Sequence, residues 1–242
     1  MRIVSKTNTG LVRNSNQDSY LTGELFGSVL WAVVCDGMGG ANGGNIASEV
    51  AAKTISEHIN SSYREGMNSN SIRYLLMSAI SAANSDVYDM AQNDDTLLGM
   101  GTTVVVVIIV NGVAHIAHAG DSRAYVIKER DMEQITRDHS IVQSMVENGE
   151  ISEEEAKHHP NRNVITRALG VNERIDIDYN EINLSQNETV MICTDGLTNY
   201  VENNEILEII KNNKFNEYPE KLIEKANNNG GGDNITVVIM SA

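Results

Sequence analysis

The stretch Val33-Val34-Cys35-Asp36-Gly37-Met38-Gly39-Gly40 takes an apolar, β-prone run into an aspartate and then into glycines. A strand that ends in a Gly-rich turn holds a carboxylate at the rim of a core and leaves the backbone open to a ligand. Residues 190–196 and 230–234 repeat this arrangement around Asp195 and Asp233. Three aspartates at such positions predict one shared site.

Length and composition indicate a globular protein with room for a sizeable core. The chain has 242 residues, of which 41% are hydrophobic and 21% are charged, and its net charge is −15. This charge argues against nucleic acid or an anionic membrane as the main partner. Some of the excess carboxylates are expected to bind cations, and an acidic soluble surface is the simpler explanation for most of the others.

The two cysteines and the apolar runs bear on the cellular compartment. Cys35 and Cys193 each lie in an apolar run just before a site aspartate, which favours two buried free thiols in a reducing compartment over a disulfide between them. The first residues lack a hydrophobic signal core, and the longest aliphatic run, residues 104–110, is too short to span a bilayer. We therefore expect a cytoplasmic protein without membrane insertion.

Most of the chain alternates between strand-like blocks and helical blocks. The β-branched run 104–110 predicts a strand buried on both faces, and Asn111-Gly112 predicts a hairpin to residues 113–119. Asp121 follows that strand as a fourth carboxylate at a strand-to-turn junction. The remaining strands are expected at 3–8, 19–22, 29–36, 124–127, 175–182, 190–193 and 235–240.

Helical spacing begins at Asn45, and a second helix is expected behind Ser71 as its N-cap. Shorter helices are expected around 206–210 and 222–226. The expected buried positions of the first two helices are Ile46, Val50, Ile55 and Ile59, then Leu75, Leu76, Ala79, Ile80, Ala83 and Val87. Strands and helices in long separate blocks favour an α+β layered fold over a βαβ alternation.

Residues 138–170 form a polar excursion between two strand-rich blocks. Residues 140–147 and 152–158 predict short helices, the second with an acidic first turn behind Ser152. A lid or partner-contact element and a packed helical connector are equally compatible with this pattern.

The four junction aspartates, Asp36, Asp121, Asp195 and Asp233, point to metal chemistry. Carboxylates without histidine or cysteine suit Mg²⁺ or Mn²⁺. Two such ions about 3.5–4 Å apart can share a bridging water that becomes a nucleophile. Arg13 offers a planar fork for phosphate oxygens, so the combination predicts hydrolysis of a phosphate ester. Taken alone, an Asp-Gly pair is more often a turn, and a single arginine is more often a solvated surface residue.

Eight ordered motifs carry a resemblance that runs from Arg13 to Val238. They are Arg13-x-x-Asn16-Gln17-Asp18, Asp36-Gly37-Met38-Gly39-Gly40, Gly101-Thr102-Thr103, Ala119-Gly120-Asp121-Ser122-Arg123, Thr136-Arg137-Asp138-His139-Ser140, the segment 163–170, Thr194-Asp195-Gly196-Leu197 and Gly232-Asp233-Asn234-Ile235-Thr236. In this respect the chain resembles the metal-dependent serine/threonine protein phosphatases, the type 2C or PPM family, in their bacterial branch.

The resemblance implies a fold and a set of site residues. The implied fold is a four-layer α/β/β/α sandwich, with two central antiparallel sheets flanked by helices. It spans residues 1–242 as one catalytic domain and includes a mobile flap at about 146–165. The resemblance implies that Asp36 is the carboxylate that bridges two ions, that the Gly37 carbonyl is a ligand of the first ion, and that Asp195 and Asp233 are ligands of the second. Asp121 together with Asp195 would bind a third ion. Arg13 would bind the phosphate, and Asp18 would be an acid that holds metal-bound water.

The implied activity is hydrolysis of phosphoserine and phosphothreonine in proteins by a metal-bridging hydroxide that attacks phosphorus. The cofactors would be two Mn²⁺ or Mg²⁺ ions, with a third expected. The partners would be phosphoproteins, namely a cognate bacterial Ser/Thr kinase and the substrates of that kinase, whose phosphorylation this chain would reverse. The expected form is a monomer. A catalytically silent relative that binds phosphoproteins is one alternative, although all four metal carboxylates are present. A cation-stabilised structural module is weaker, because it leaves Arg13 without a role.

The histidines fit structural roles better than ligand roles. His115 and His118 lie within a strand and are expected to be buried, whereas His158 and His159 are expected to be exposed. His139, at a helix start, either orients that start or approaches the cleft.

Ala41 departs from the family pattern, in which Asp-Gly-Met-Gly-Gly is commonly followed by histidine. If a histidine there serves as the general acid in other members, a metal-bound water is the hypothetical proton donor to the leaving oxygen in this chain. Because a general acid is worth about 10²–10⁴-fold, Ala41→His should raise turnover and add a limb to the pH–rate profile. An unchanged profile would exclude the hypothesis.

Overall fold

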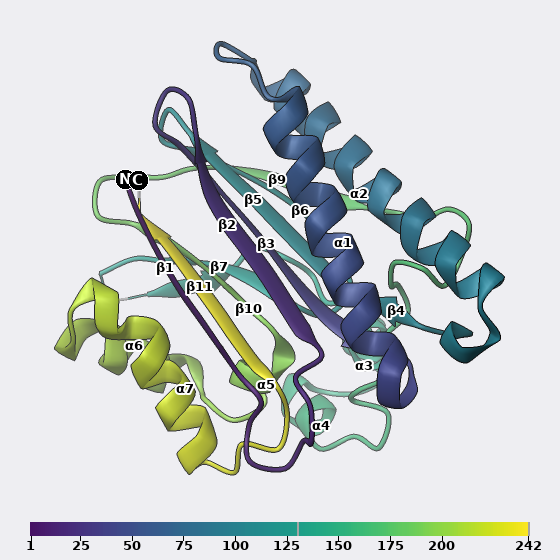
Figure 1. Ribbon diagram of the computed structural model, residues 1–242. Coiled ribbons are helices and arrows are strands. Elements are labelled where there is room, and N and C mark those ends of the chain that lie inside the picture. The colour runs from purple at the N-terminus through teal and green to yellow at the C-terminus, as the bar shows by residue number, and fades with distance from the viewer. Residues whose placement is uncertain (130, 242) are drawn as a thin grey trace.

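Two antiparallel sheets form the centre of the molecule (Figure 1). The computed structural model describes residues 1–129 and 131–241, without the side chains of residues 40–42. One sheet has the order β1 (Arg2–Asn8), β11 (Ile235–Ser241), β10 (Thr189–Cys193), β7 (Arg123–Ile127) and β8 (Met132–Gln134). The other has the order β2 (Asp18–Leu25), β3 (Val29–Met38), β5 (Val104–Val110), β6 (Val113–Ala119) and β9 (Asp178–Asn183), with β4 (Gly101–Thr102) beside β3.

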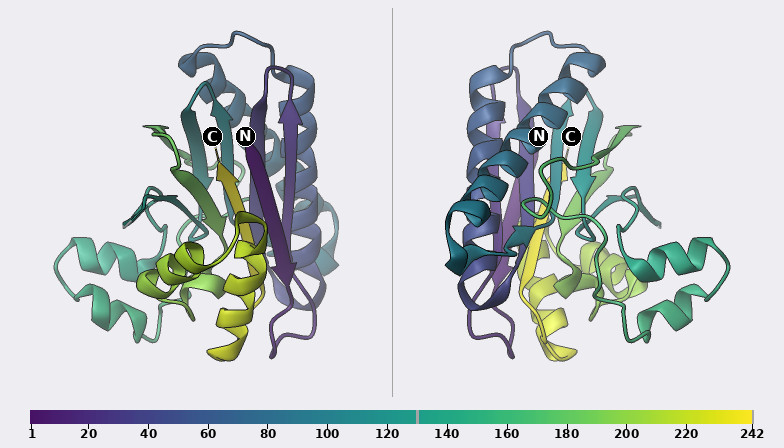
Figure 2. Two further views of the ribbon diagram at one scale, coloured as in Figure 1. Left: turned by 90° about the vertical axis from the view of Figure 1, so that its left-hand side faces the viewer. Right: turned by 90° about the vertical axis from the view of Figure 1, so that its right-hand side faces the viewer.

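Helices cover the outer face of each sheet (Figure 2). The long helices α1 (Gly40–Ser62) and α2 (Ser69–Asn93) pack on the β3–β5–β6 sheet. Helices α6 (Asn203–Asn212) and α7 (Tyr218–Asn228) pack on the other sheet. The 3₁₀ turns η1 (Asp95–Leu97) and η2 (Phe215–Glu217) lie beside these pairs. The α+β fold with two antiparallel sheets and flanking helices is confirmed.

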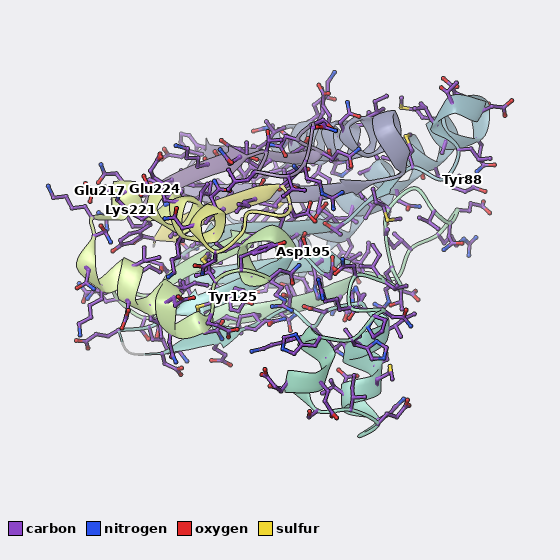
Figure 3. All side chains as sticks on the ribbon, turned by 90° about the horizontal axis from the view of Figure 1, so that it is seen from below. Tyr88, Tyr125, Asp195, Glu217, Lys221 and Glu224 are labelled. Carbon is purple, nitrogen blue, oxygen red and sulfur yellow. The ribbon has the colours of Figure 1, made fainter. Side chains whose placement is uncertain are left out.

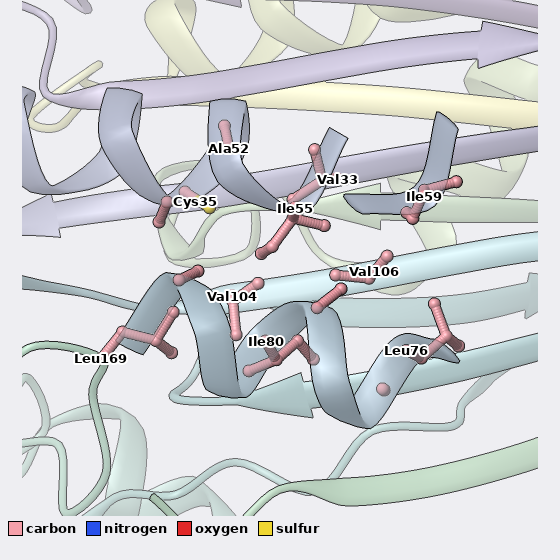
Figure 4. Close-up of a cluster of buried hydrophobic side chains, with 14 of the residues drawn as sticks. Val33, Cys35, Ala52, Ile55, Ile59, Leu76, Ile80, Val104, Val106 and Leu169 are labelled. Atoms are coloured by element: carbon pink, nitrogen blue, oxygen red, sulfur yellow. The ribbon is translucent and has the colours of Figure 1, made fainter. Parts of the chain in front are cut away.

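Strand alternation divides the core into three layers. Successive side chains of a strand point to opposite faces, so each central strand contributes to two layers. Along β3 the side chains that face α1 and α2 are Trp31, Val33 and Cys35, and those that face the other sheet are Leu30, Ala32 and Val34. Figure 4 shows the layer under α1 and α2, where Ile55 and Ile80 meet Val104 and Val106.

The buried aliphatic strand and its hairpin match the prediction. Every residue of β5 is buried, as expected for a strand covered on both faces. Asn111 and Gly112 both have positive φ, 52° and 75°, and they join β5 to β6. Positive φ at both central residues is what a two-residue type I′ turn requires.

The two cysteines lie in different core layers. Cys35 faces the α1–α2 layer, whereas Cys193 faces the layer under α6 and α7. Both are free and buried, so the expectation of free thiols is confirmed and the disulfide is excluded.

Some boundaries differ from the predictions. Helix α1 begins at Gly40, not Asn45, because Gly39 adopts a left-handed conformation with φ 119° and starts the helix directly. Helix α2 is capped by Asn68, whose side chain accepts a hydrogen bond from the backbone N–H of Ser71, so Ser71 lies inside the helix. Strand β9 begins at Asp178, since residues 172–177 pair with no strand.

The polar excursion forms two short helices as predicted, α3 (Ile141–Glu147) and α4 (Glu153–Lys157). Ser140 caps the first, and Ser152 forms a capping box with Glu155 at the second. Val142 is buried in α3, whereas no residue of α4 is buried. Figure 2 shows that this teal segment projects from the body at the end of the molecule away from the chain termini.

Among the residues that the structure describes, no helix has the length and apolar character needed to cross a membrane.

The packing of α2 against the sheet provides a test of the layered core. Ile80 is fully buried in that layer, whereas Tyr74 on the same helix is 75% exposed. Ile80→Ala should lower the free energy of unfolding by about 2–5 kcal/mol. Tyr74→Ala should change it by about 0.5 kcal/mol or less, as measured by urea denaturation. Equal losses from the two variants would contradict this layer arrangement.

Candidate metal centre

The four predicted aspartates line one cavity at the end of the sandwich. The cavity has a volume of 610 Å³, and its lining includes Asp36, Asp121, Asp195, Asp233 and Arg13. The loops that bring these residues together all lie at the end opposite the chain termini (Figure 1). Seen from below, Asp195 lies near the middle of this end, with α3 and α4 to one side (Figure 3).

Asp36 and Asp18 face each other across two strands. Asp36 is inside β3 rather than at its end, and it pairs with Asp18 in the β2–β3 register. Asp18 is buried, and its Oδ2 accepts hydrogen bonds from the hydroxyls of Thr194 at 2.9 Å and Thr236 at 2.7 Å. Within the described part of the chain, Asp18 Oδ1 is buried without a hydrogen-bond partner.

Thr103 connects the backbone of Asp36 to the turn that carries Asp121. The Asp36 N–H donates to Thr103 Oγ1 at 3.0 Å, and that oxygen lies 2.7 Å from Ser122 Oγ. Gly120 has φ +113°, and a Cβ there would lie 2.6 Å from the Thr103 side chain. This turn takes the chain from β6 in one sheet to β7 in the other, so it lies at the end of the sandwich.

Asp195 and Asp233 are brought together by a close backbone approach. Asp195 opens the short helix α5 (Asp195–Thr198), and its Oδ2 accepts from Asn199 Nδ2 at 2.9 Å. A Cβ on Gly196 would lie 1.9 Å from the carbonyl oxygen of Asn234, so only glycine allows the two loops this spacing.

The Arg13 loop is held by Asn234. The side chain of Asn234 accepts from the Gln17 N–H at 2.8 Å and donates to the carbonyls of Thr9 and Ser15, both at 2.9 Å. Arg13 itself is half exposed, and its Nη2 lies 2.8 Å from Asp233 Oδ2. A guanidinium that is held at the mouth of the cavity and can leave this partner is suited to an incoming anion.

The cluster of carboxylates is electrostatically unfavourable. Burial, together with the neighbouring aspartates, raises the pKa of Asp18 to about 7 and of Asp121 to about 8, and raises the pKa of Asp36 and Asp195. Arg123 lowers the pKa of Asp121 only in part, and its guanidinium is paired with Asp138 through Nε and Nη2 at 2.6–3.0 Å.

These donors suit hard divalent cations. Four carboxylates converge without a cysteine or histidine in the cavity lining, and Asp18 adds an unpaired oxygen. Gly37 also lines the cavity, and a Cβ there would lie 2.0 Å from the carbonyl oxygen of Gly44, so only glycine fits at this position. The roles of the individual residues stay predictions, and the side chain of Ala41 lies outside the described part of the chain.

Three threonines and one asparagine that support the carboxylates belong to the sequence motifs, but the sequence alone did not predict a function for them. Thr103, Thr194, Thr236 and Asn234 are all buried and hydrogen-bond to the loops or carboxylates of the cluster. For Thr194, Asn234 and Thr236 the signal in the sequence is a hydroxyl or amide one to three residues from Asp195 or Asp233. Thr103 directly precedes β5.

Among the histidines, His115 and His118 are buried in β6 as expected, and His158 is exposed, whereas His159 is only partly exposed. His139 is buried beside the Asp121 turn and contacts its backbone. It does not line the cavity.

The raised pKa values give the metal-free chain a definite pH dependence. Asp18 and Asp121 bind protons more tightly in the folded chain than in the unfolded one, where the pKa is near 3.8. Their contribution to stability is therefore complete below about pH 4 and is lost as the pH rises towards about 8. After chelation, Asp121→Asn should raise the free energy of unfolding above that of wild type, and this gain should be larger at about pH 8 than at about pH 5. Urea denaturation of both proteins at the two pH values measures it. The exposed Asp89→Asn is the control, and an Asp121→Asn curve parallel to wild type would contradict the prediction.

Comparison with known proteins identifies the family. The model for protein phosphatase 2C matches residues 12–236. The serine/threonine phosphatase stp of Listeria monocytogenes is 35% identical over 239 residues, which cover 97% of this chain and 93% of the relative. The structure of the S. agalactiae serine/threonine phosphatase aligns with a TM-score of 0.93 at 32% identity and covers 100% of this chain and 99% of that one.

A further solved structure is that of the catalytic domain of the serine/threonine protein phosphatase PstP in complex with two manganese ions. It aligns with a TM-score of 0.86 at 30% identity and covers 98% of this chain and 96% of that one. The chain therefore belongs to the protein phosphatase 2C family, in its bacterial branch, and is a serine/threonine protein phosphatase.

Proposed function

We propose that the aspartate cluster holds Mn²⁺ or Mg²⁺ and that the chain uses these ions to hydrolyse phosphoserine and phosphothreonine in proteins. The observation that carries the proposal is the convergence of four carboxylates from separate segments of the chain around one cavity with Arg13 at its mouth. The two manganese ions bound by PstP, a relative that aligns along nearly the whole chain, support the same assignment.

In this proposal Asp36, Asp195, Asp233 and the Gly37 carbonyl would hold the first two ions. Asp121 would hold a third ion together with Asp195. When bound, the ions supply an activated hydroxide for attack on phosphorus and offset negative charge on the phosphoryl oxygens.

The residues of the chain bind and orient the substrate around this centre. Arg13 exchanges the Asp233 carboxylate for two phosphoryl oxygens, because its planar fork matches their geometry and its half-exposed side chain is free to turn. Asn234 keeps the Arg13 loop at the cavity through its three hydrogen bonds. The unpaired Oδ1 of Asp18 would accept a hydrogen bond from water held on the inner side of the cluster.

Residues 146–165 act as the flap in this proposal. A second cavity of 730 Å³ adjoins the first. It is lined on one side by the α3–α4 segment, defined as residues 141–166, and on the other by residues 198–204. Lys157 in α4 lies 3.2 Å from the Glu202 carboxylate across this space. A segment with so little buried surface can adjust to the polypeptide around a phosphorylated residue.

The physiological role proposed from the resemblance is reversal of a bacterial Ser/Thr kinase. The substrates would be the kinase and its target proteins, which phosphoproteomics of a deletion strain would identify. Sites whose phosphorylation rises in the deletion strain and falls again on complementation are the expected result.

Loss of a metal carboxylate should abolish the reaction without unfolding the chain. With Mn²⁺ and a phosphothreonine peptide, Asp36→Asn and Asp233→Asn should reduce kcat/KM by more than about 100-fold, beyond the effect usual for residues that only support metal ligands. The exposed Asp89→Asn on α2 is the matched control and should retain activity.

Exhaustive chelation should also abolish hydrolysis, and Mn²⁺ should restore it. Activity that survives chelation would exclude the metal-dependent reaction. A wild-type chain that binds Mn²⁺ but fails to hydrolyse p-nitrophenyl phosphate would instead support the catalytically silent alternative.

A further inference from the structure

His139 connects three parts of the molecule that meet beside the metal centre. Its Nδ1 lies 3.0 Å from the backbone nitrogen of Gly120, and its own N–H donates to the Gly120 carbonyl at 3.0 Å. Its carbonyl accepts from the Thr166 N–H at 2.7 Å, at the C-terminal end of the α3–α4 segment. The side chain of His139 is 1% exposed, so this contact with the turn that carries Asp121 is fully enclosed.

The hydrogen bonds determine the tautomer of His139. Because a backbone N–H can only donate, Nδ1 must be the unprotonated nitrogen that accepts from Gly120. The proton is then on Nε2, which lies 3.1 Å from Asp178 Oδ2 and donates to it. Burial lowers the pKa of His139, in agreement with a neutral ring. A carboxylate that orients a histidine in this way fixes both ring rotation and tautomer.

Two neighbours hold this arrangement in place. His118 stacks on His139 with ring centroids 4.7 Å apart and an interplanar angle of 5°. Its Nε2 donates to the Arg137 carbonyl at 2.9 Å. Arg167, just beyond the α3–α4 segment, donates from Nη1 to Asp178 Oδ1 at 2.8 Å.

The ligand-type atoms of His118, His139 and Asp178 lie within 4.8 Å of one another, which is close enough for a cation site. The Arg167 guanidinium argues against one, because its Nη1 already lies 3.1 Å from His139 Nε2 and is paired with Asp178. A second cation in that space would face direct repulsion. The cluster is therefore better described as a hydrogen-bonded support.

We propose that His139 is a positioning residue for the metal centre: oriented by Asp178, it accepts the Gly120 N–H and thereby fixes the turn that presents Asp121. His139 also joins that turn to the end of the α3–α4 segment in two ways: its carbonyl accepts from Thr166, and its ring contacts Asp178, which is paired with Arg167. This inference rests on the proposed function, since Asp121 must contact a cation for its position to matter.

Two substitutions at His139 distinguish the effect of its hydrogen-bond acceptor, Nδ1, from the effect of the rest of the ring. His139→Ala removes both nitrogens, whereas His139→Asn places an amide oxygen where Nδ1 accepts from Gly120. His115→Asn is the matched control, because His115 is also fully buried, in β6, but hydrogen-bonds Tyr179 instead of the Asp121 turn. Should His139→Ala fail to fold, Asp178→Ala replaces it, since Asp178 is 37% exposed and its loss leaves no large cavity.

The first readout is hydrogen exchange of the Gly120 amide in the metal-free chain, followed by NMR. Exchange should be faster in His139→Ala, or in Asp178→Ala if that variant is needed, and should stay slow in His139→Asn and His115→Asn. The second readout is Mn²⁺ binding by calorimetry. The weakest-bound ion should lose about 10–100-fold in affinity in His139→Ala, the usual range for a residue that supports a metal ligand. His139→Asn should recover most of that affinity.

The kinetic readout completes the test. With p-nitrophenyl phosphate, His139→Ala should need more Mn²⁺ for half-maximal activity, while KM at saturating Mn²⁺ stays near the wild-type value. Unchanged Gly120 exchange and Mn²⁺ affinity in His139→Ala, or equal losses in His139→Asn and His139→Ala, would overturn the proposal. A wild-type chain without phosphatase activity would refute the proposed function instead, and the exchange and calorimetric readouts would still decide the role of His139.

Discussion

Repulsion among crowded carboxylates, one buried and four half-buried, is the constraint on which this end of the molecule depends. Asp18 and Asp36 are direct cross-strand neighbours, an arrangement that is unfavourable for like charges. Asp121, Asp195 and Asp233 add to the same field, and burial together with this repulsion raises the pKa of Asp36, Asp18 and Asp121. A fold that maintains such a cluster must hold its backbone firmly, and binding of cations would then offset the repulsion.

The sandwich supplies this rigidity through its alternating strands. In β3, Cys35 packs under α1 while its neighbour Asp36 turns towards the cavity, so this carboxylate is adjacent to a fully buried residue. Between the strands, hydroxyl and amide groups replace solvent as partners. Thr103 links Asp36 to the Asp121 turn, and Asn234 ties the Asp233 loop to the Arg13 loop. His139 extends the same support to the α3–α4 segment.

The fold class could be predicted from the sequence. The convergence of the four aspartates could also be predicted, because each aspartate lies where an apolar run meets glycine. The Asp18–Asp36 pairing could not be predicted in this way, since it depends on the register of β2 against β3, which local residues do not encode. Likewise, the cap of α2 is Asn68 and not Ser71, because four consecutive residues, 68–71, are all of a type that can cap a helix. The partners of His139 lie 19 to 39 residues away in sequence, so only the fold brings them together.

The most direct test of a cation-dependent cluster is the thermal unfolding of the chelated chain before and after addition of Mn²⁺ at about pH 8. Mn²⁺ at a hundredfold excess over Kd adds about 2.7 kcal/mol to the folded state. Because 1 kcal/mol shifts Tm by about 2–4 °C in a chain of this size, wild type should gain about 5–10 °C and Asp36→Asn much less. An unchanged wild-type Tm, or an equal gain in Asp36→Asn, would contradict a metal centre built on these aspartates.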